Sequence, residues 1–152
     1  MRMINQNFYN KILQNMPVLC VDAVIISQKG VLFLKRKNSP ALNEWWFPGG
    51  RVFKNEKIED TLFRKIKEEV NIKPRLLRFL GFTQTIFDDG MFGIQTHTVN
   101  LTYLLICEDF NHIKIDANHD DYLWTFDYEK LNLNSEILEL LKNNKIDDKC
   151  LI

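Results

Sequence analysis

Residues 50–72 read GRVFKNEKIEDTLFRKIKEEVNI, a stretch that combines a helical pattern with an unusual placement of charge. Its apolar side chains recur at the 3.6-residue period of an amphipathic helix, which we predict over residues 57–71. They are Ile58, Leu62, Phe63, Ile66 and Val70. On this helix Glu69 falls inside the apolar arc, whereas Glu68 falls outside it. A carboxylate directed toward a core is costly without a cation, strong donors or a metal, so we expect Glu69 to have a specific partner.

The charges of this helix also allow a plainer interpretation. Arg64 and Glu68 are four residues apart, as are Lys65 and Glu69, and this is the spacing of ion pairs on a helix surface. Such exposed pairs are common and weak. We expect this interpretation to apply to Glu68 and Lys65, whereas the position of Glu69 in the apolar arc argues against it there.

Secondary structure is predicted on both sides of this helix. We expect an amphipathic helix over residues 4–14 and a closing helix capped by Ser135, with a polar tail from Asn143 that can fray. Apolar and β-branched runs predict strands over residues 18–27, 31–37, 76–85, 96–107 and 122–126. This order of elements predicts an α+β fold in which a mixed sheet carries helices on its faces.

The composition limits the classes of function. A chain of 152 residues has the size of one domain, so we expect residues 1–152 to form a single unit. Its 20 basic residues balance 20 acidic ones, which argues against nucleic acid as a partner. No apolar run approaches bilayer length, so no membrane association is expected. Cys20, Cys107 and Cys150 lack CxxC spacing and indicate a reducing cytoplasm rather than a disulfide framework or a zinc site.

Residues 50–72 resemble the Nudix box, whose pattern is Gly, five residues, Glu, seven residues, then Arg-Glu-apolar-any-Glu-Glu-any-Gly-apolar. The matching positions are Gly50, Glu56, Arg64, Ile66, Glu68, Glu69 and Ile72. Two positions depart from it, because Lys65 replaces a glutamate and Asn71 replaces the glycine. Asparagine is the usual substitute for glycine at a helix C-terminus, but lysine offers no anionic metal ligand. The resemblance implies a Nudix-type α/β/α sandwich with a mixed sheet.

Other positions are similar to one branch of that family, the GDP-mannose mannosyl hydrolases. They are Asn7-Phe8, Pro17, Asp22, Lys35-Arg36, Trp46, residues 47–52, Asp88-Asp89, His97, residues 118–122 and Trp124. In that branch water attacks the anomeric carbon of the sugar and leaves the nucleoside diphosphate intact. The resemblance therefore implies hydrolysis of a nucleoside-diphosphate sugar, GDP-mannose or a similar compound, to nucleoside diphosphate and free sugar.

The resemblance also implies a role for each site residue. The metal ligands would be the Gly49 carbonyl, Glu69 and Asn118, with Glu68 as a further candidate, and the ion would be Mg²⁺ or alternatively Mn²⁺. The catalytic residues would be Arg36 and Arg51 on the diphosphate and His119 as general base. From residue chemistry alone, Asp120 or Asp121 could orient His119, and Asp22, which is costly in an apolar strand unless paired, is expected near Arg36, Arg51 or substrate. The substrate contacts would be Asn7, Phe8, Arg36, Arg51 and His97, although the position of His97 on a strand fits a core or cross-strand residue equally well. These residue types suit the chemistry, since guanidinium groups match phosphate oxygens and Mg²⁺ prefers oxygen ligands.

Several departures keep other readings open. Asn7 and Asn118 stand where the mannosyl hydrolases have aspartate and glutamine. An amide cannot accept both hydrogen-bond donors of guanine as a carboxylate does, and asparagine is one methylene shorter than glutamine in its reach to the metal. The retained Glu68 allows a Nudix pyrophosphatase that cleaves P–O in a nucleoside diphosphate derivative. Lys65 allows a nucleotide-sugar binding module with weak catalysis. The N-terminal helix, over residues 4–14, is a candidate dimer arm, and a homodimer is expected by the same resemblance.

Overall fold

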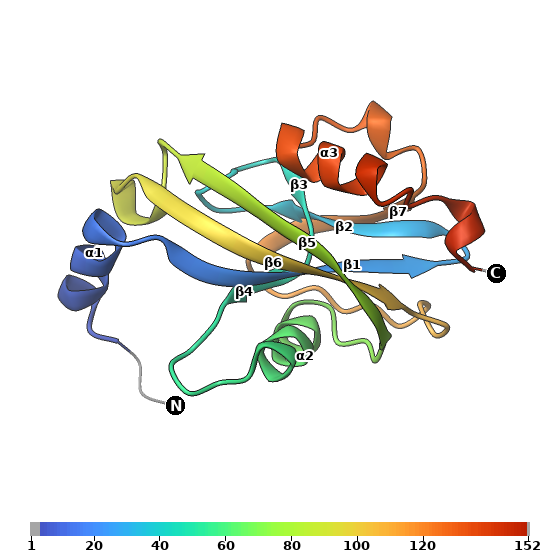
Figure 1. Ribbon diagram of the computed structural model, residues 1–152, viewed down its shortest axis with the longest axis horizontal. Coiled ribbons are helices and arrows are strands. Elements are labelled where there is room, and N and C mark those ends of the chain that lie inside the picture. The colour runs from blue at the N-terminus through green and yellow to red at the C-terminus, as the bar shows by residue number, and fades with distance from the viewer. Residues whose placement is uncertain (1–3, 152) are drawn as a thin grey trace.

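The sheet is built on one long strand that continues, through a tight turn, into the next. The computed structural model describes residues 4–151 (Figure 1). Its strands are β1 (Val18–Ser27), β2 (Gly30–Arg36), β3 (Trp45–Trp46), β4 (Gly49–Arg51), β5 (Arg75–Phe87), β6 (Thr96–Ile106) and β7 (His119–Thr125). Its α-helices are α1 (Gln6–Asn15), α2 (Ile58–Glu69) and α3 (Ser135–Asn143). Short 3-10 helices cover Met91–Gly93, Tyr128–Lys130 and Asp148–Leu151.

The strands form the mixed sheet that the sequence predicts. Their order is β3-β2-β1-β6-β5, with β4 beside β1 and β7 beside β2. The β1–β6 pair is parallel and the other pairs are antiparallel. Strands β1 and β2 pair only beside their turn, at Ile26↔Val31 and Ser27↔Gly30. Farther along they separate, and β4 takes the place beside β1. This fork in the sheet leaves room for a site.

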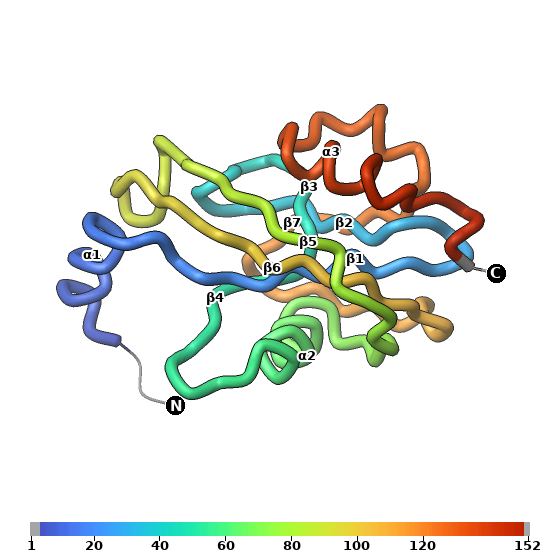
Figure 2. The backbone as a smooth tube through the Cα atoms, viewed as in Figure 1, coloured from blue at the N-terminus to red at the C-terminus, as the bar shows by residue number. Residues whose placement is uncertain are grey.

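Helices cover both faces of the sheet, as expected for a sandwich. Alternate residues of a strand point to opposite faces, and β1 uses both for packing. Val21, Ala23 and Ile25 pack with α2 through Leu62 and Ile66. The backbone trace in Figure 2 shows α2 and α3 on opposite sides of the sheet.

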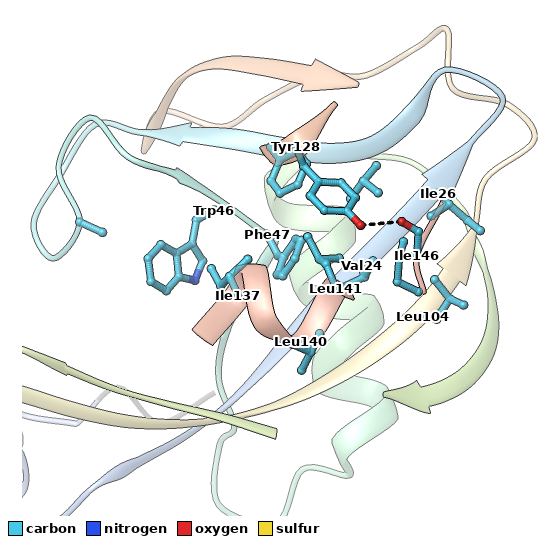
Figure 3. Packing of buried hydrophobic residues seen from close by; sticks show 13 residues of the cluster. Val24, Ile26, Trp46, Phe47, Leu104, Tyr128, Ile137, Leu140, Leu141 and Ile146 are labelled. Atoms are coloured by element: carbon cyan, nitrogen blue, oxygen red, sulfur yellow. Dashed lines mark hydrogen bonds between the residues drawn. The ribbon is translucent and has the colours of Figure 1, made fainter. Parts of the chain in front are cut away.

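The second face holds the larger aromatic cluster. Val24 and Ile26 of β1 pack with Ile137 and Leu141 of α3, and Figure 3 shows Tyr128 beside them. The hydroxyl group of Tyr128 donates a hydrogen bond of 2.9 Å to the carbonyl oxygen of Ile146. Because Ile146 is fully buried, the chain after α3 is packed, and the fraying expected from Asn143 onward is wrong as far as Ile146.

Other local expectations also need correction. The residue that caps α3 is Asn134, whose side chain accepts from the backbone N–H of Glu136, rather than Ser135. Strand β7 begins at His119, earlier than the predicted Tyr122, because His119 pairs with Arg36 across a bulge in the ladder. None of the helices between residues 4 and 151 has both the length and the apolarity needed to cross a bilayer.

Candidate active site

A pocket of about 790 Å³ opens where β1 and β2 separate. The sequence-predicted site residues in its lining are Asp22, Arg36, Gly49, Arg51, Glu68, Glu69, Asn118 and His119. They come from β1, β2, β4, α2 and β7 and the turn before it, so segments far apart in the chain meet here. Asn7, Phe8 and His97 are not in that lining.

Glu69 has the specific partners that its place in the apolar arc requires. The side chain is buried, and its Oε2 accepts a hydrogen bond of 3.0 Å from the backbone N–H of Gly49. Its Oε1 lies 2.9 Å from the Nζ atom of Lys65. The i,i+4 pair of Lys65 and Glu69 therefore forms, but in the wall of the pocket rather than on an open helix surface.

Lys65 also contacts the neighbouring carboxylate. Its Nζ lies 3.3 Å from Oε2 of Glu68, whose side chain is 47% exposed. Burial on its own would lower the pKa of Lys65, but the charges of Glu69 and Glu68 outweigh it and raise the pKa. The ammonium group therefore stays charged in the pocket wall.

Arg64 ties α2 to the loop before it. Its Nε and Nη2 atoms donate to the two carboxylate oxygens of Glu56, at 2.6 and 2.9 Å, and Nη2 also donates to the carbonyl oxygen of Arg51 at 3.2 Å. Hydrogen bonding from Arg64 is the main reason that the pKa of Glu56 is lowered to about 2. These two box residues hold β4 against the helix, which positions Arg51.

The aromatic wall beside Arg51 is formed by a residue that the sequence analysis did not select. The Cζ atom of Arg51 lies 4.3 Å from the ring centroid of Tyr9, close enough for a cation–π contact. Tyr9 is buried and lines the pocket. Phe8 is 60% exposed and lines a neighbouring groove. The spacing of Tyr9 and Leu13, four residues apart on the buried side of α1, is the signal that could have found Tyr9.

Arg36 stands at the end of β2, opposite His119 in the sheet. Its Nε donates a hydrogen bond of 2.7 Å to the carbonyl oxygen of Pro40, which holds the guanidinium group against the pocket. Burial lowers the pKa of Arg36, while Glu69 and Asp22 act in the opposite direction. Arginine remains charged at any ordinary pH, so this side chain is a partly buried cation that a phosphate group can neutralise.

His119 is buried, and a carboxylate fixes its ring. Its Nδ1 atom lies 2.6 Å from Oδ1 of Asp116. The predicted orienting residues are wrong, because Asp120 lies 3.8 Å from Lys37 and Asp121 accepts from the backbone N–H of Tyr122. The turn before β7 instead brings Asp116 back to His119. We assign the ring proton to Nδ1 from this contact, which leaves Nε2 as an acceptor.

Asn118 supports the same carboxylate. Its backbone N–H and its side-chain amide donate to the two oxygens of Asp116, each at 3.0 Å. Burial on its own would raise the pKa of Asp116, but hydrogen bonds from His119 and Asn118 outweigh it and lower the pKa. The amide oxygen of Asn118 accepts a hydrogen bond of 3.2 Å from Asn38, which leaves its second lone pair for a metal ion.

The floor of the pocket contains a buried carboxylate, Asp22. The side-chain amide of Asn100 donates a hydrogen bond of 2.9 Å to its Oδ2. Burial raises the pKa of Asp22 to about 7, and the charge of Glu69 adds to this effect. Thr96, Thr98 and Asn100 of β6 also line the pocket, so by strand alternation His97 points to the opposite face, where its buried Nε2 has no hydrogen-bond partner.

The raised pKa of Asp22 predicts how stability depends on pH. An unfolded aspartate ionises near 3.8, whereas Asp22 in the folded protein holds its proton up to about 7. Between these values the folded state binds more protons, so the contribution of Asp22 to the free energy of unfolding falls as pH rises. Asp22→Asn removes this loss, and urea denaturation in EDTA should find the variant gaining stability relative to wild type as pH rises through this window. A difference in unfolding free energy between Asp22→Asn and wild type that is the same at about pH 4.5 and pH 8 would contradict the raised pKa of Asp22.

The oxygen donors of the pocket suit one divalent ion. Among residues 4–151 there is no group of three or more His, Cys, Asp and Glu side chains that could hold a metal by itself. Mg²⁺ needs only one or two carboxylates when the phosphates of a substrate and water complete its shell. Glu69 and the adjoining Gly49 carbonyl meet that requirement, beside two arginines that suit phosphate.

Comparison with known proteins agrees with this fold. The NUDIX domain family matches residues 16–145. The chain is 34% identical over 112 residues to the low-salt glycan biosynthesis protein Agl8 of Haloferax volcanii, which covers 73% of this chain and 72% of that protein. It is 30% identical over 89 residues to an ADP-ribose pyrophosphatase of Methanocaldococcus jannaschii, covering 59% of this chain and half of that protein.

A solved structure gives the same result for the fold. The NUDIX domain of Shewanella oneidensis NrtR, crystallised with ADP ribose, superposes with a TM-score of 0.69 at 22% sequence identity. The match covers 98% of this chain and 100% of that one. The family match spans most of the chain, and the box residues occupy the pocket wall. The chain therefore belongs to the Nudix family.

Proposed function

We propose that this protein is an Mg²⁺-dependent hydrolase of a nucleoside-diphosphate sugar, GDP-mannose or a similar compound. Water attacks the anomeric carbon, with His119 as general base, and the products are nucleoside diphosphate and free sugar. The observation that carries this proposal is the 2.6 Å contact of Asp116 with the buried ring of His119, which lines the same pocket as Arg36 and Arg51.

The pair has the parts that a general base requires. An imidazole can take up and release a proton near neutral pH. A carboxylate hydrogen-bonded to one ring nitrogen stabilises the imidazolium that forms when the other ring nitrogen takes a proton. Asp116 holds Nδ1, so Nε2 receives the proton of the attacking water. Asn118 holds Asp116 through two hydrogen bonds, which fixes the ring for that step.

The arginines suit the leaving group. Departure of a diphosphate from the anomeric carbon builds negative charge on its oxygens, and preformed cations stabilise that charge most in the transition state. Arg36 and Arg51 both line the pocket, held by Pro40 and by Tyr9. A Mg²⁺ ion held by Glu69, the Gly49 carbonyl and Asn118 would neutralise further charge on the diphosphate. Asp22 lies beside Arg36 and adds a compensating negative charge there once its carboxyl ionises.

Cellular setting and assembly complete the proposal. Cys20 and Cys107 are buried free thiols, which suits a reducing cytoplasm. A homodimer through α1 is supported by apolar side chains that remain open there, since Phe8 is 60% and Met16 is 61% exposed. The name of Agl8, a glycan biosynthesis protein, is compatible with a sugar nucleotide as substrate.

A second function is favoured by Glu68. Its carboxylate is half-exposed at the pocket beside Glu69, as attack of water on phosphorus by way of carboxylate-bound metal ions requires. The relative from Methanocaldococcus jannaschii is named an ADP-ribose pyrophosphatase. The competing role is a pyrophosphatase that cleaves P–O in an ADP-ribose-like compound or a nucleoside-diphosphate sugar. Against it, Lys65 and Arg64 already neutralise Glu68.

The two functions place the oxygen of water in different products. Purified protein is incubated in ¹⁸O-labelled water with Mg²⁺ and with GDP-mannose, GDP-glucose, CDP-glucose or ADP-ribose. Mass spectrometry then identifies which product carries the ¹⁸O label. We expect label on the free sugar beside an unlabelled nucleoside diphosphate. Label on a phosphate would establish the pyrophosphatase. Binding of these compounds without turnover would indicate a nucleotide-sugar binding module.

A further inference from the structure

Lys65 is built into the pocket rather than free to move. Its side chain is 18% exposed, and its stem lies across the backbone of Gly50. A Cβ atom at Gly50 would come within 2.8 Å of the Cε atom of Lys65, and the backbone of Gly50 has a φ of +154°, which favours glycine. The absence of a side chain at Gly50 therefore makes the space in which Lys65 lies.

The ammonium group of Lys65 occupies the space between two carboxylates. Its Nζ lies 2.9 Å from Oε1 of Glu69 and 3.3 Å from Oε2 of Glu68. The other oxygen of Glu69 accepts from the backbone N–H of Gly49. Every carboxylate oxygen that faces this space therefore already has a positive or hydrogen-bonding partner.

A divalent ion and this ammonium group compete for the same place. An ion that bridged Glu68 and Glu69 would need the oxygens that Lys65 contacts, and a divalent ion placed there would be repelled strongly by the ammonium group beside it. Only an ion on the Gly49 side of Glu69, away from Glu68, avoids most of this cost. The position beside Glu68 is therefore closed to a metal while Lys65 remains.

We propose that Lys65 is a built-in cation that replaces a second divalent ion between Glu68 and Glu69, so that the pocket binds one ion. The inference rests on the proposed function only in requiring a divalent ion at Glu69, and it holds whichever bond of the substrate is cleaved. It assigns Lys65 a defined task, which is to supply permanently the positive charge that a second metal would supply on binding.

Counting bound Mn²⁺ tests this task without substrate or turnover. Free Mn²⁺ is titrated by electron paramagnetic resonance against wild type, Lys65→Glu and Lys67→Glu. Lys67→Glu is the matched control, because it makes the same change of charge on the same helix at an exposed position outside the pocket lining. We expect one ion for wild type and for Lys67→Glu, and one additional ion for Lys65→Glu, in which three carboxylates meet.

The difference in bound Mn²⁺ between wild type and Lys65→Glu tests the role of Lys65. The number of ions bound by wild type tests the metal requirement of the proposed function. An equal count for wild type and Lys65→Glu, or two ions in wild type, would overturn the inference. No ion in wild type would instead count against Mg²⁺ dependence. Lys65→Met provides a second test in case Lys65→Glu does not fold. Because Lys65→Met lacks the competing ammonium group, its first Mn²⁺ ion should bind roughly 5-fold or more tightly than that of wild type. An unchanged affinity in folded Lys65→Met, judged by its melting curve, would also overturn it.

Discussion

His119→Gln is expected to lower kcat by ~10²–10⁴-fold while KM changes little. Glutamine keeps a hydrogen-bonding side chain of similar reach but cannot take a proton from water. Because His119 would act on the attacking water rather than on the bound nucleotide, ground-state binding should survive. Steady-state kinetics with the best substrate from the ¹⁸O experiment measures both constants.

The chain offers a matched control in His112. It lies 3.1 Å from Asp109, the same i,i+3 spacing as His119 and Asp116, but its side chain is 83% exposed. His112→Gln should therefore leave kcat unchanged. The kcat of Asp116→Asn should lie between those of His119→Gln and His112→Gln, because the His119 ring loses its orienting carboxylate but keeps Nε2 as a proton acceptor. Near-normal turnover in His119→Gln would remove His119 from the chemistry and with it the main support for attack on carbon.

The fold was largely predictable because its signals are local and periodic. The apolar arc of α2 and the long apolar runs of β1 and β6 each give a strong pattern, and together they predict a mixed sheet with helices on its faces. Strands β3 and β4 are too short for any pattern, since each exists only through its pairing with a long strand. The fork between β1 and β2 is likewise a tertiary feature.

The candidate site was predictable where spacing along the chain carries it. Glu69, Gly49 and Arg51 lie within the box and its border, and all three line the pocket. Partners that arrive from other elements were not accessible in this way. Asp116 and Asn100 reach His119 and Asp22 through a turn and a neighbouring strand, and no periodicity specifies either contact.

Glu69→Gln is expected to weaken Mn²⁺ binding and to lower kcat by on the order of 10²-fold or more, because the pocket loses its buried anionic ligand. Glutamine has the same shape, and its amide oxygen can still accept from the backbone N–H of Gly49, so the strand contact survives. The ion pair of Glu69 with Lys65 is lost, so the melting temperature should fall, and both measurements are made at a temperature at which the variant is folded. Titration with Mn²⁺ measures the loss of metal affinity, and steady-state kinetics on the same preparation measures the loss in kcat.

Glu68→Gln is the matched control, since it removes the same charge from the next residue. Its carboxylate is 47% exposed and paired with Lys65 and Arg64. If one ion at Glu69 serves attack on carbon, Glu68→Gln should change kcat by less than roughly 3-fold, as expected for a screened surface pair. Equal losses in the two variants would mean that both carboxylates hold metal. Together with ¹⁸O on a phosphate product, that result would assign the chain to pyrophosphate cleavage.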